Sequence, residues 1–256
     1  MYSKRSLPDA ISHRGLHASV PENSIPAFLA AIDAGTDAIE LDVHASVDDT
    51  LFVHHDPGIP VPSADGGTRA IAQMDSGEIS RLRLPGDVGI PTLDDTLEAI
   101  GERARVFIEI KARAIEETVA RCLRRHSARS PLYAVHSFDH RAAKRMLELF
   151  PSVRTGILQV AYPVDSCAVM RAAGASDLWQ AAEFVDPSLV VNVHACGGRV
   201  IAWTANDESV WTALASAGVD GICTDRVDAY VAWREQQSAV DSRESTLSTD
   251  GALNGG

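Results

Sequence analysis

The fold is decided by the stretch Ala38-Ile39-Glu40-Leu41-Asp42-Val43, which reads as a buried β-strand and yet carries two carboxylates. Side chains alternate between the faces of a strand, so Glu40 and Asp42 project side by side while their apolar neighbours point the other way. Two ionised groups in a confined space repel, and desolvating them is costly unless a cation or a donor compensates. A bound divalent metal ion would resolve this conflict, whereas a solvated edge strand is the plainer interpretation of the stretch alone.

Short apolar runs alternate with helical patterns along nearly the whole chain, which is typical of parallel strands joined by crossover helices. Eight such units in about 235 residues suit a closed TIM (β/α)8 barrel, whose usual size is roughly 250 residues. The strands are predicted over 10–13, 38–43, 105–111, 132–137, 154–158, 177–181, 199–204 and 220–224. The helices are predicted over 24–34, 93–102, 115–126, 139–149, 163–173, 187–196, 208–217 and 228–236.

A ninth extended run, over 50–55, follows the second strand after a link that is too short for a crossover helix. We therefore expect a hairpin-like return that brings His55 near Asp42.

Two further segments depart from the barrel pattern. Residues 56–91 are rich in Gly, Pro, Ser and Asp without a clear period, so we interpret them as a small insertion or lid. Residues 238–256 contain almost no large apolar side chains and are expected to form a disordered tail. The remaining chain, over 1–237, is expected to be a single barrel domain.

Composition bounds the partners and the compartment. The 35 acidic and 23 basic residues give a net charge of -12, which argues against a nucleic-acid binder. No secretory signal and no run near the length of a membrane span is present, so we expect a cytoplasmic protein without stable membrane insertion. The sequence does not indicate which oligomeric state the protein adopts. The widely spaced cysteines predict reduced packing residues rather than a zinc site or disulfides: Cys122, Cys167, Cys196 and Cys223.

Charged residues collect where predicted strands end, and in a TIM barrel the catalytic groups come from these ends. Solvated strand faces would scatter over both ends of the strands, so this joint placement favours a functional site. The charged ends are Ser12-His13-Arg14-Gly15, Glu40-Leu41-Asp42, His54-His55-Asp56 and Ile108-Glu109-Ile110-Lys111.

The carboxylates and cations of these ends suit a phosphate site. Glu40, Asp42 and Glu109 offer hard oxygen ligands, which suit Mg²⁺ or Ca²⁺ rather than zinc. Arg14 and Lys111 supply positive charge for an anionic group of the substrate.

Two histidines at the charged strand ends can transfer protons. His13 and His55 can titrate near neutral pH and serve as a general acid and base pair, which together with the metal and the cations predicts phosphoryl transfer. His54 competes with His55 on sequence alone. His17 and His44 are expected to be bystanders.

These motifs resemble the glycerophosphodiester phosphodiesterase family over about residues 10–232. The resemblance rests on the set rather than on any single piece. Its pieces are His13-Arg14-Gly15, Pro21-Glu22-Asn23-Ser24, Glu40-Leu41-Asp42-Val43, His55-Asp56, Ile90-Pro91-Thr92-Leu93, Ile108-Glu109-Ile110-Lys111, Ser137-Phe138, Trp203-Thr204-Ala205-Asn206 and Gly218-Val219-Asp220-Gly221-Ile222-Cys223-Thr224-Asp225.

The resemblance implies a TIM barrel that hydrolyses small glycerophosphodiesters, such as glycerophosphocholine, to glycerol 3-phosphate and an alcohol. It implies the acid and base roles for His13 and His55 without assigning which is which. The other implied roles are metal ligands for Glu40, Asp42 and Glu109, phosphate contacts for Arg14 and Lys111, support of Arg14 or the metal shell for Glu22, and a pocket wall for Trp203.

Three alternatives stay open at this point. The substrate could be a lysophospholipid, although no amphipathic membrane-binding helix stands out. The barrel could be a catalytically inactive binding module, although the whole charged set is present. A barrel isomerase or aldolase is the third, with Lys111 as a Schiff-base amine. A lysine beside a metal carboxylate is better placed as a charged clamp.

Overall fold

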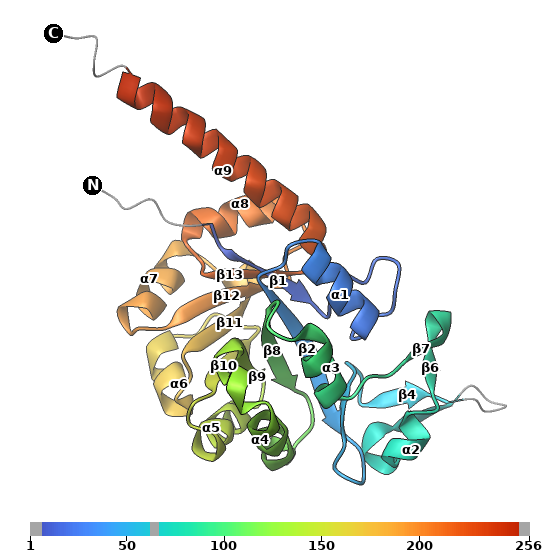
Figure 1. The fold of residues 1–256 in the computed structure, drawn as a ribbon. Coiled ribbons are helices and arrows are strands. Elements are labelled where there is room, and N and C mark those ends of the chain that lie inside the picture. Colours follow the sequence, from blue (N-terminus) through green and yellow to red (C-terminus); the bar gives the residue numbers. More distant parts are fainter. Residues whose placement is uncertain (1–6, 62–66, 251–256) are drawn as a thin grey trace.

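A closed barrel of eight parallel strands forms the centre of the molecule (Figure 1). The computed structural model describes residues 7–61 and 67–250. Its barrel strands are β1 (Asp9–His13), β2 (Ala38–Ala45), β8 (Arg105–Ile110), β9 (Tyr133–Ser137), β10 (Arg154–Gln159), β11 (Asp177–Ala181), β12 (Arg199–Trp203) and β13 (Gly221–Thr224). They pair in the order β1-β13-β12-β11-β10-β9-β8-β2, and β1 pairs again with β2, so the sheet closes on itself. The predicted TIM barrel is confirmed.

Helices surround this barrel (Figure 1). Side-chain caps begin several of them: Ser24 accepts from the Ala27 N–H, and Thr92 accepts from the Asp95 N–H. The surrounding helices are α1 (Ile25–Asp33), α3 (Leu93–Ile100), α4 (Glu116–Arg125), α5 (His140–Leu149), α6 (Ser166–Ala173), α7 (Pro187–Ala195), α8 (Glu208–Ala217) and α9 (Val227–Asp250). Each predicted helix overlaps one of these.

One apolar residue from each barrel strand contributes to a buried layer inside the barrel. Because side chains alternate along a strand, the residue two positions further on points inward as well. This relation places His13, Glu40 and Glu109 next to the apolar layer, towards the carboxyl ends of their strands. The layer consists of Ile11, Ala38, Phe107, Ala134, Leu158, Trp179, Ile201 and Cys223.

Strand β3 (Leu51–Val53) runs antiparallel to the end of β2, as the short link predicted. Val43 pairs with Val53, and the His54 N–H donates to the Asp42 carbonyl oxygen at 3.0 Å. The return therefore brings the His55 backbone next to the acidic strand.

The insertion after this return is a small folded unit beside the barrel (Figure 1). An apolar cluster of its own, which includes Ile59, Ile71 and Ile79, packs against Phe52. The unit's elements are β4 (Gly58–Pro60), β5 (Thr68–Ala70), η1 (Ile71–Gln73), α2 (Ser76–Ile79), β6 (Arg83–Leu84), η2 (Pro85–Asp87) and β7 (Val88–Gly89).

The last helix corrects the prediction of a disordered tail over 238–256. Helix α9 runs to Asp250 and extends beyond the barrel (Figure 1), while residues 251–256 lie outside the described part. Its first turns are anchored, because the Tyr230 hydroxyl donates to the Pro8 carbonyl oxygen at 3.0 Å. A helix that has begun propagates cooperatively, and neither Gly nor Pro interrupts the chain before Gly251.

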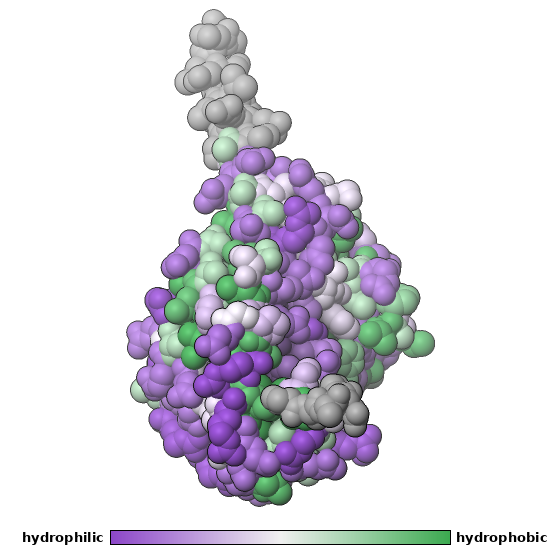
Figure 2. Space-filling model, turned by 90° about the vertical axis from the view of Figure 1, so that its right-hand side faces the viewer, coloured by the Kyte–Doolittle hydropathy of each residue, from purple (hydrophilic) through white to green (hydrophobic). Residues whose placement is uncertain are grey.

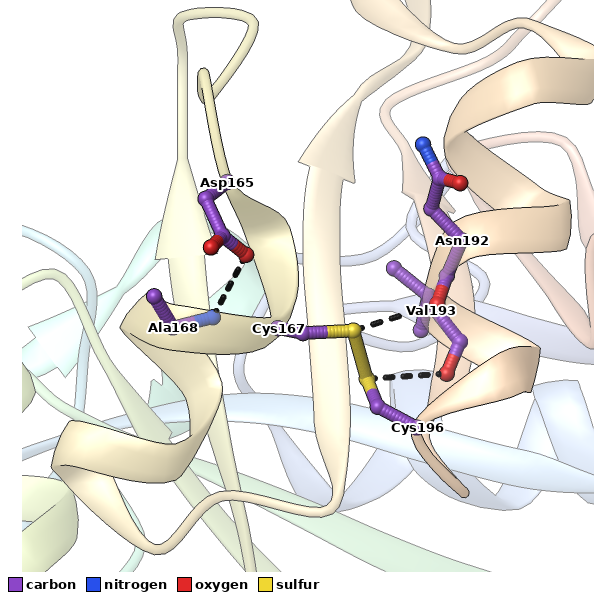
Figure 3. Close-up of a disulfide and its surroundings, with 6 residues drawn as sticks. All are labelled: Asp165, Cys167, Ala168, Asn192, Val193 and Cys196. Carbon is purple, nitrogen blue, oxygen red and sulfur yellow. Dashed lines mark hydrogen bonds between the residues drawn. A yellow bond between two sulfur atoms is a disulfide. The ribbon is translucent and has the colours of Figure 1, made fainter.

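A disulfide between Cys167 and Cys196 corrects the prediction of four reduced cysteines (Figure 3). It joins α6 to the end of α7, with the two Cα atoms 6.0 Å apart. Sequence spacing could not reveal it, because the cysteines are separated by 29 residues and meet only when consecutive helices pack side by side. Cys122 and Cys223 are buried and unbonded, as expected.

Within the described ranges, none of the helices combines the length and the apolar character needed to cross a bilayer. The face drawn in Figure 2 is largely hydrophilic, with apolar residues in smaller groups.

The disulfide predicts a thiol count and a stability difference. Denatured, unreduced protein should titrate two free thiols, and reduction should raise the count to four. Replacing both Cys167 and Cys196 by Ser should lower the free energy of unfolding by about 3–4 kcal/mol, as expected for a closed loop of this length. Denaturant unfolding measures the difference, which should vanish when both proteins are reduced. Four thiols in the unreduced protein would contradict the bond.

Candidate active site

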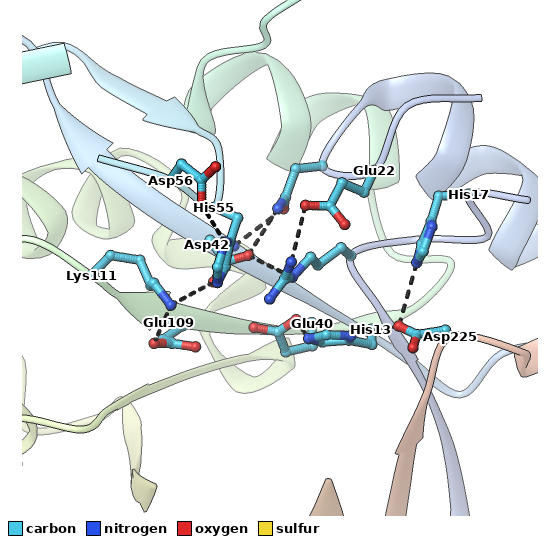
Figure 4. A network of polar contacts seen from close by, with 12 residues as sticks. His13, His17, Glu22, Glu40, Asp42, His55, Asp56, Glu109, Lys111 and Asp225 are labelled. Atoms are coloured by element: carbon cyan, nitrogen blue, oxygen red, sulfur yellow. Dashed lines mark hydrogen bonds and ion pairs between the residues drawn. The ribbon is translucent and has the colours of Figure 1, made fainter. Parts of the chain in front are cut away.

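All of the predicted site residues lie at one rim of the barrel, around a cavity of about 210 Å³. Figure 4 shows their polar network. Asp42 and Glu22 lie beside the cavity and contact its lining through Arg14. The predicted residues that line it are His13, Arg14, Glu40, His55, Glu109, Lys111 and Trp203.

Three carboxylates from two neighbouring strands meet at this rim. Glu40 and Asp42 lie on β2, and Asp42 stands in register with Glu109 on β8. Their exposed fractions are only 2%, 1% and 7%, so none is a solvated strand face. The plainer interpretation of the acidic stretch is thereby wrong.

Burial and mutual repulsion raise the pKa values of two of these groups. Burial raises the pKa of Glu40 to about 8, and the charge of Asp42 adds to the effect. Burial raises the pKa of Glu109 to about 7, with the charge of Glu40 as the second cause. Burial would also raise the pKa of Asp42, but the cations Arg14 and Lys111 and a hydrogen bond from Asn23 outweigh it and lower that pKa.

Two cations bracket Asp42. The Arg14 Nε lies 3.1 Å from the Asp42 Oδ2, and the Lys111 Nζ lies 3.5 Å from its Oδ1 and 3.0 Å from the Glu109 Oε1. Burial alone would lower the pKa of Lys111, but Glu109 and Asp42 outweigh burial and raise it. Lys111 is thus held as an ammonium ion, which disfavours the Schiff-base alternative.

A tight turn after β1 orients Arg14. Arg14 and Gly15 both adopt positive φ angles, of 56° and 85°, and the Arg14 N–H donates to the Glu40 carbonyl oxygen at 2.9 Å. A Cβ at Gly15 would lie 2.7 Å from the Ala27 carbonyl carbon, so only glycine fits against α1. The turn locks the guanidinium beside the acidic strand.

The loop before α1 completes the support of these groups. Glu22 lies 3.0 Å from the Arg14 Nη1. Asn23, in the next position, donates from its amide to the Asp42 Oδ2 at 2.8 Å. Asn23 belongs to the quoted Pro21-Glu22-Asn23-Ser24 motif, but no role was predicted for it.

Each of the two predicted catalytic histidines is held at Nδ1 by a carboxylate. The His13 Nδ1 lies 2.6 Å from the Asp225 Oδ1, and the His55 Nδ1 lies 2.8 Å from the Asp56 Oδ1. In each ring, Nδ1 is thus the nitrogen that the carboxylate engages. No role was predicted for Asp225. Its Oδ1 also lies 3.4 Å from the His17 Nε2.

The other histidines near the rim have separate contacts. Burial alone would raise the pKa of Asp225, but the hydrogen bonds from His13 and His17 outweigh burial and lower that pKa. The His44 Nε2 donates to the His55 carbonyl oxygen at 3.1 Å and so supports the loop that carries His55. His55 is among the residues that line the cavity, and His54 is not.

His136 on β9 was missed by the sequence analysis. Its Nε2 lies 3.7 Å from the Glu40 Oε1, and its ring stacks on Trp179 at 4.2 Å between centroids. Burial lowers its pKa to about 4, so the imidazole is neutral. Its position in the strand could have indicated it, because His136 lies two residues after the inward-facing Ala134.

An apolar wall faces the charged groups across the cavity. Trp203 and Phe138 pack edge to face, with ring centroids 5.4 Å apart. Leu158, Trp179 and Cys223 complete the wall. The cavity is therefore charged on one side and apolar on the other.

The donors at the rim fit a divalent cation. The Glu40 Oε2 and the Asp42 Oδ1 are buried without a hydrogen-bond partner in the described part of the chain. Glu40 and Glu109 also form, with His136, a group whose ligand atoms lie within 4.8 Å of one another. Sites that are rich in oxygen donors and short of positive charge bind divalent ions.

A TIM barrel with acidic, cationic and imidazole groups at one rim is the architecture of a hydrolase that acts on phosphoric diesters. The chain belongs to the glycerophosphoryl diester phosphodiesterase family, whose family model matches residues 13–229. The expected family and enzyme class are confirmed.

Known relatives agree with this membership. A probable glycerophosphodiester phosphodiesterase 2 of Mycobacterium tuberculosis is 32% identical over 239 residues, covering 86% of this chain and 88% of that protein. A glycerophosphodiester phosphodiesterase of Caldanaerobacter subterraneus is 30% identical, covering 84% and 93%. A phosphodiesterase of Oleispira antarctica, solved in complex with the product sn-glycerol 3-phosphate, is 26% identical with a TM-score of 0.78, covering 92% of this chain and 97% of that chain.

The raised pKa of Glu40 predicts a pH-dependent effect of its removal. Between its ordinary value of 4.5 and about 8, the folded protein keeps a proton that the unfolded chain releases, so this group's contribution to stability falls as the pH rises. In metal-free protein at pH 8, Glu40→Gln should raise the free energy of unfolding by about 2–4 kcal/mol, because one pKa unit corresponds to about 1.4 kcal/mol. Denaturant unfolding at pH 5 should show little difference.

Asp225→Asn is the matched control with the opposite sign. The lowered pKa of Asp225 means that its ionised form stabilises the folded state above its ordinary value of 3.8. This variant should be less stable than the parent protein at pH 8. Equal effects of the two variants would contradict the assigned charge balance.

Proposed function

We propose that the protein hydrolyses glycerophosphodiesters to glycerol 3-phosphate and an alcohol, using a divalent metal ion and the histidine pair His13 and His55. One observation carries the proposal. At the barrel rim, two buried carboxylates, two cations and two carboxylate-bound histidines line one cavity, and the buried Asp42 lies beside it.

Glu40, Asp42 and Glu109 would hold the metal ion. Bound there, the ion would supply positive charge that polarises the phosphoryl group and stabilises charge in the transition state. Carboxylate oxygens alone favour Mg²⁺ or Ca²⁺. The unpartnered oxygens and the raised pKa values of Glu40 and Glu109 support a cation at this place.

Arg14 and Lys111 would contact the phosphate oxygens. Both cations are half-buried and are already oriented by Asp42. Charged donors that are fixed before the reaction stabilise developing negative charge without reorganisation. Glu22 holds the far side of the Arg14 guanidinium and would act through it.

His13 and His55 would move the protons. One ring would take a proton from the attacking nucleophile at Nε2, and the other would donate a proton to the leaving alkoxide. Asp225 and Asp56 orient the rings and fix which nitrogen carries the proton. Trp203 and Phe138 would wall the side of the leaving group.

The compartment remains a proposal as well. A cytoplasmic location is expected from the sequence, but the Cys167–Cys196 bond weakens it, since disulfides are rare in reducing compartments. Trapping thiols by alkylation in intact cells before lysis would decide the redox state of this pair.

The catalytic assignment predicts different effects of neighbouring histidines. His55→Ala and Glu40→Ala should each lower kcat/KM for glycerophosphocholine by about 10²–10⁴-fold, because each removes a group that acts in the transition state. Release of glycerol 3-phosphate is measured, and EDTA should abolish it. His54→Ala is the matched control and should retain most activity. Activity that survives in His55→Ala or in EDTA would sink the mechanism.

A second candidate substrate is a diester with an acyl chain, such as a lysophospholipid. Among the described residues, the exposed large apolar side chains other than Val47 and Val191 lie in the loops after β9, β10 and β11. These loops follow the carboxyl ends of the strands, so they stand at the rim that carries the site. The side chains are Phe138, Val160, Tyr162, Val164 and Phe184.

A substrate panel distinguishes the two candidates. If the apolar rim binds an acyl chain, lysophosphatidylcholine should be cleaved with a lower KM than glycerophosphocholine. Phe138→Ser should then raise the KM for the lysophospholipid by about 10-fold, the value of one partly buried aromatic contact. Val191→Ser, an exposed apolar residue on α7, should leave it unchanged. A lysophospholipid that is cleaved no better than glycerophosphocholine would rule out this candidate.

A further inference from the structure

The group Glu40, Glu109 and His136 differs from the predicted all-carboxylate ligand set. The three side chains are buried, and one ligand atom of each lies within 4.8 Å of the others. The His136 Nε2 is the closest ring nitrogen to Glu40 that the structure shows, at 3.7 Å from Oε1, with the His13 Nε2 at 4.0 Å from Oε2.

Asp42 is engaged differently from the members of this group. Its Oδ2 accepts from Asn23 at 2.8 Å and lies 3.1 Å from the Arg14 Nε, and its Oδ1 faces Lys111. The Glu40 Oε2 and the Asp42 Oδ1 both lack a hydrogen-bond partner in the described part of the chain, but Lys111 stands 3.5 Å from the Asp42 atom. Glu40 thus keeps one oxygen, Oε2, without a hydrogen bond, while His136 approaches its other oxygen, Oε1.

Packing fixes the direction of the His136 ring. Trp179 stacks on it with an interplanar angle of 9°, and Phe107 approaches it edge-on at 6.4 Å. Its Nδ1 is buried without a hydrogen-bond partner among the described residues, while its Nε2 points to Glu40. A neutral imidazole oriented in this way presents a nitrogen to the carboxylate pair.

We propose that His136 is a nitrogen ligand of the bound ion, together with Glu40 and Glu109. The proposal rests on the metal site of the proposed function and changes its ion. Ca²⁺ takes oxygen ligands, and Mg²⁺ is bound through carboxylates, phosphates and water, whereas imidazole suits transition ions. The site selects an ion that accepts both donors, such as Mn²⁺, over Ca²⁺.

Pulsed electron paramagnetic resonance of the Mn²⁺-loaded protein tests the nitrogen ligand directly. The parent protein should show ¹⁴N hyperfine coupling from a directly bound imidazole, and His136→Asn should lose it. Calorimetric titration should show Mn²⁺ affinity falling by about 10–100-fold in His136→Asn, with Ca²⁺ affinity changed much less.

His13→Asn is the matched control, because His13 also lies near Glu40. It should keep the nitrogen coupling although it loses activity. Coupling that disappears in His13→Asn and persists in His136→Asn would overturn the proposal, as would Mn²⁺ bound without nitrogen coupling. Absence of any divalent binding would overturn the metal-dependent function as well, so the two failures are distinguishable.

Isotope labelling covers the case in which His136→Asn fails to fold. Parent protein and His13→Asn would then be labelled with ¹⁵N-histidine and loaded with Mn²⁺. A ¹⁵N coupling that replaces the ¹⁴N pattern in both would support a histidine other than His13 as the ligand. Its absence from both would overturn the proposal.

Discussion

The crowding of Glu40, Asp42 and Glu109 inside the barrel rim is the constraint on which the site depends. Arg14 and Lys111 are both directed at Asp42, and Lys111 also reaches Glu109, so Glu40 is left with the least compensation. Burial and repulsion then raise the pKa values of Glu40 and Glu109. The turn at Gly15, the Asn23 amide and the Asp225 carboxylate all serve to orient groups around this charge.

Strand alternation links this constraint to the core. The apolar layer takes Ile11, Ala38 and Phe107 from three strands, and the residues two positions later are His13, Glu40 and Glu109. Most of the fold and of the site could be predicted for this reason. Buried runs locate the strands, and the period of two decides which charged residues share the barrel interior.

The features that escaped prediction depend on contacts between distant segments. The Cys167–Cys196 bond requires α6 and α7 to lie side by side, which spacing does not encode. Helix α9 continues to Asp250 although the composition after Gln237 is polar, and its first turn is anchored to Pro8 through Tyr230. His136 stands on a strand without other charged residues, so only its register with Ala134 could have indicated it.

Nearly all of the charged groups that line the cavity come from the first 111 residues, from His13 to Lys111, and the antiparallel return at β3 adds His55 to them. The later strands contribute chiefly the apolar wall, with Trp179 and Trp203, and the exposed loops beyond it. The proposed bond cleavage and the proposed contacts to the leaving group would therefore fall on opposite arcs of one ring. A substitution in the second arc would then alter the contacts of the alcohol without disturbing the charge balance of the first.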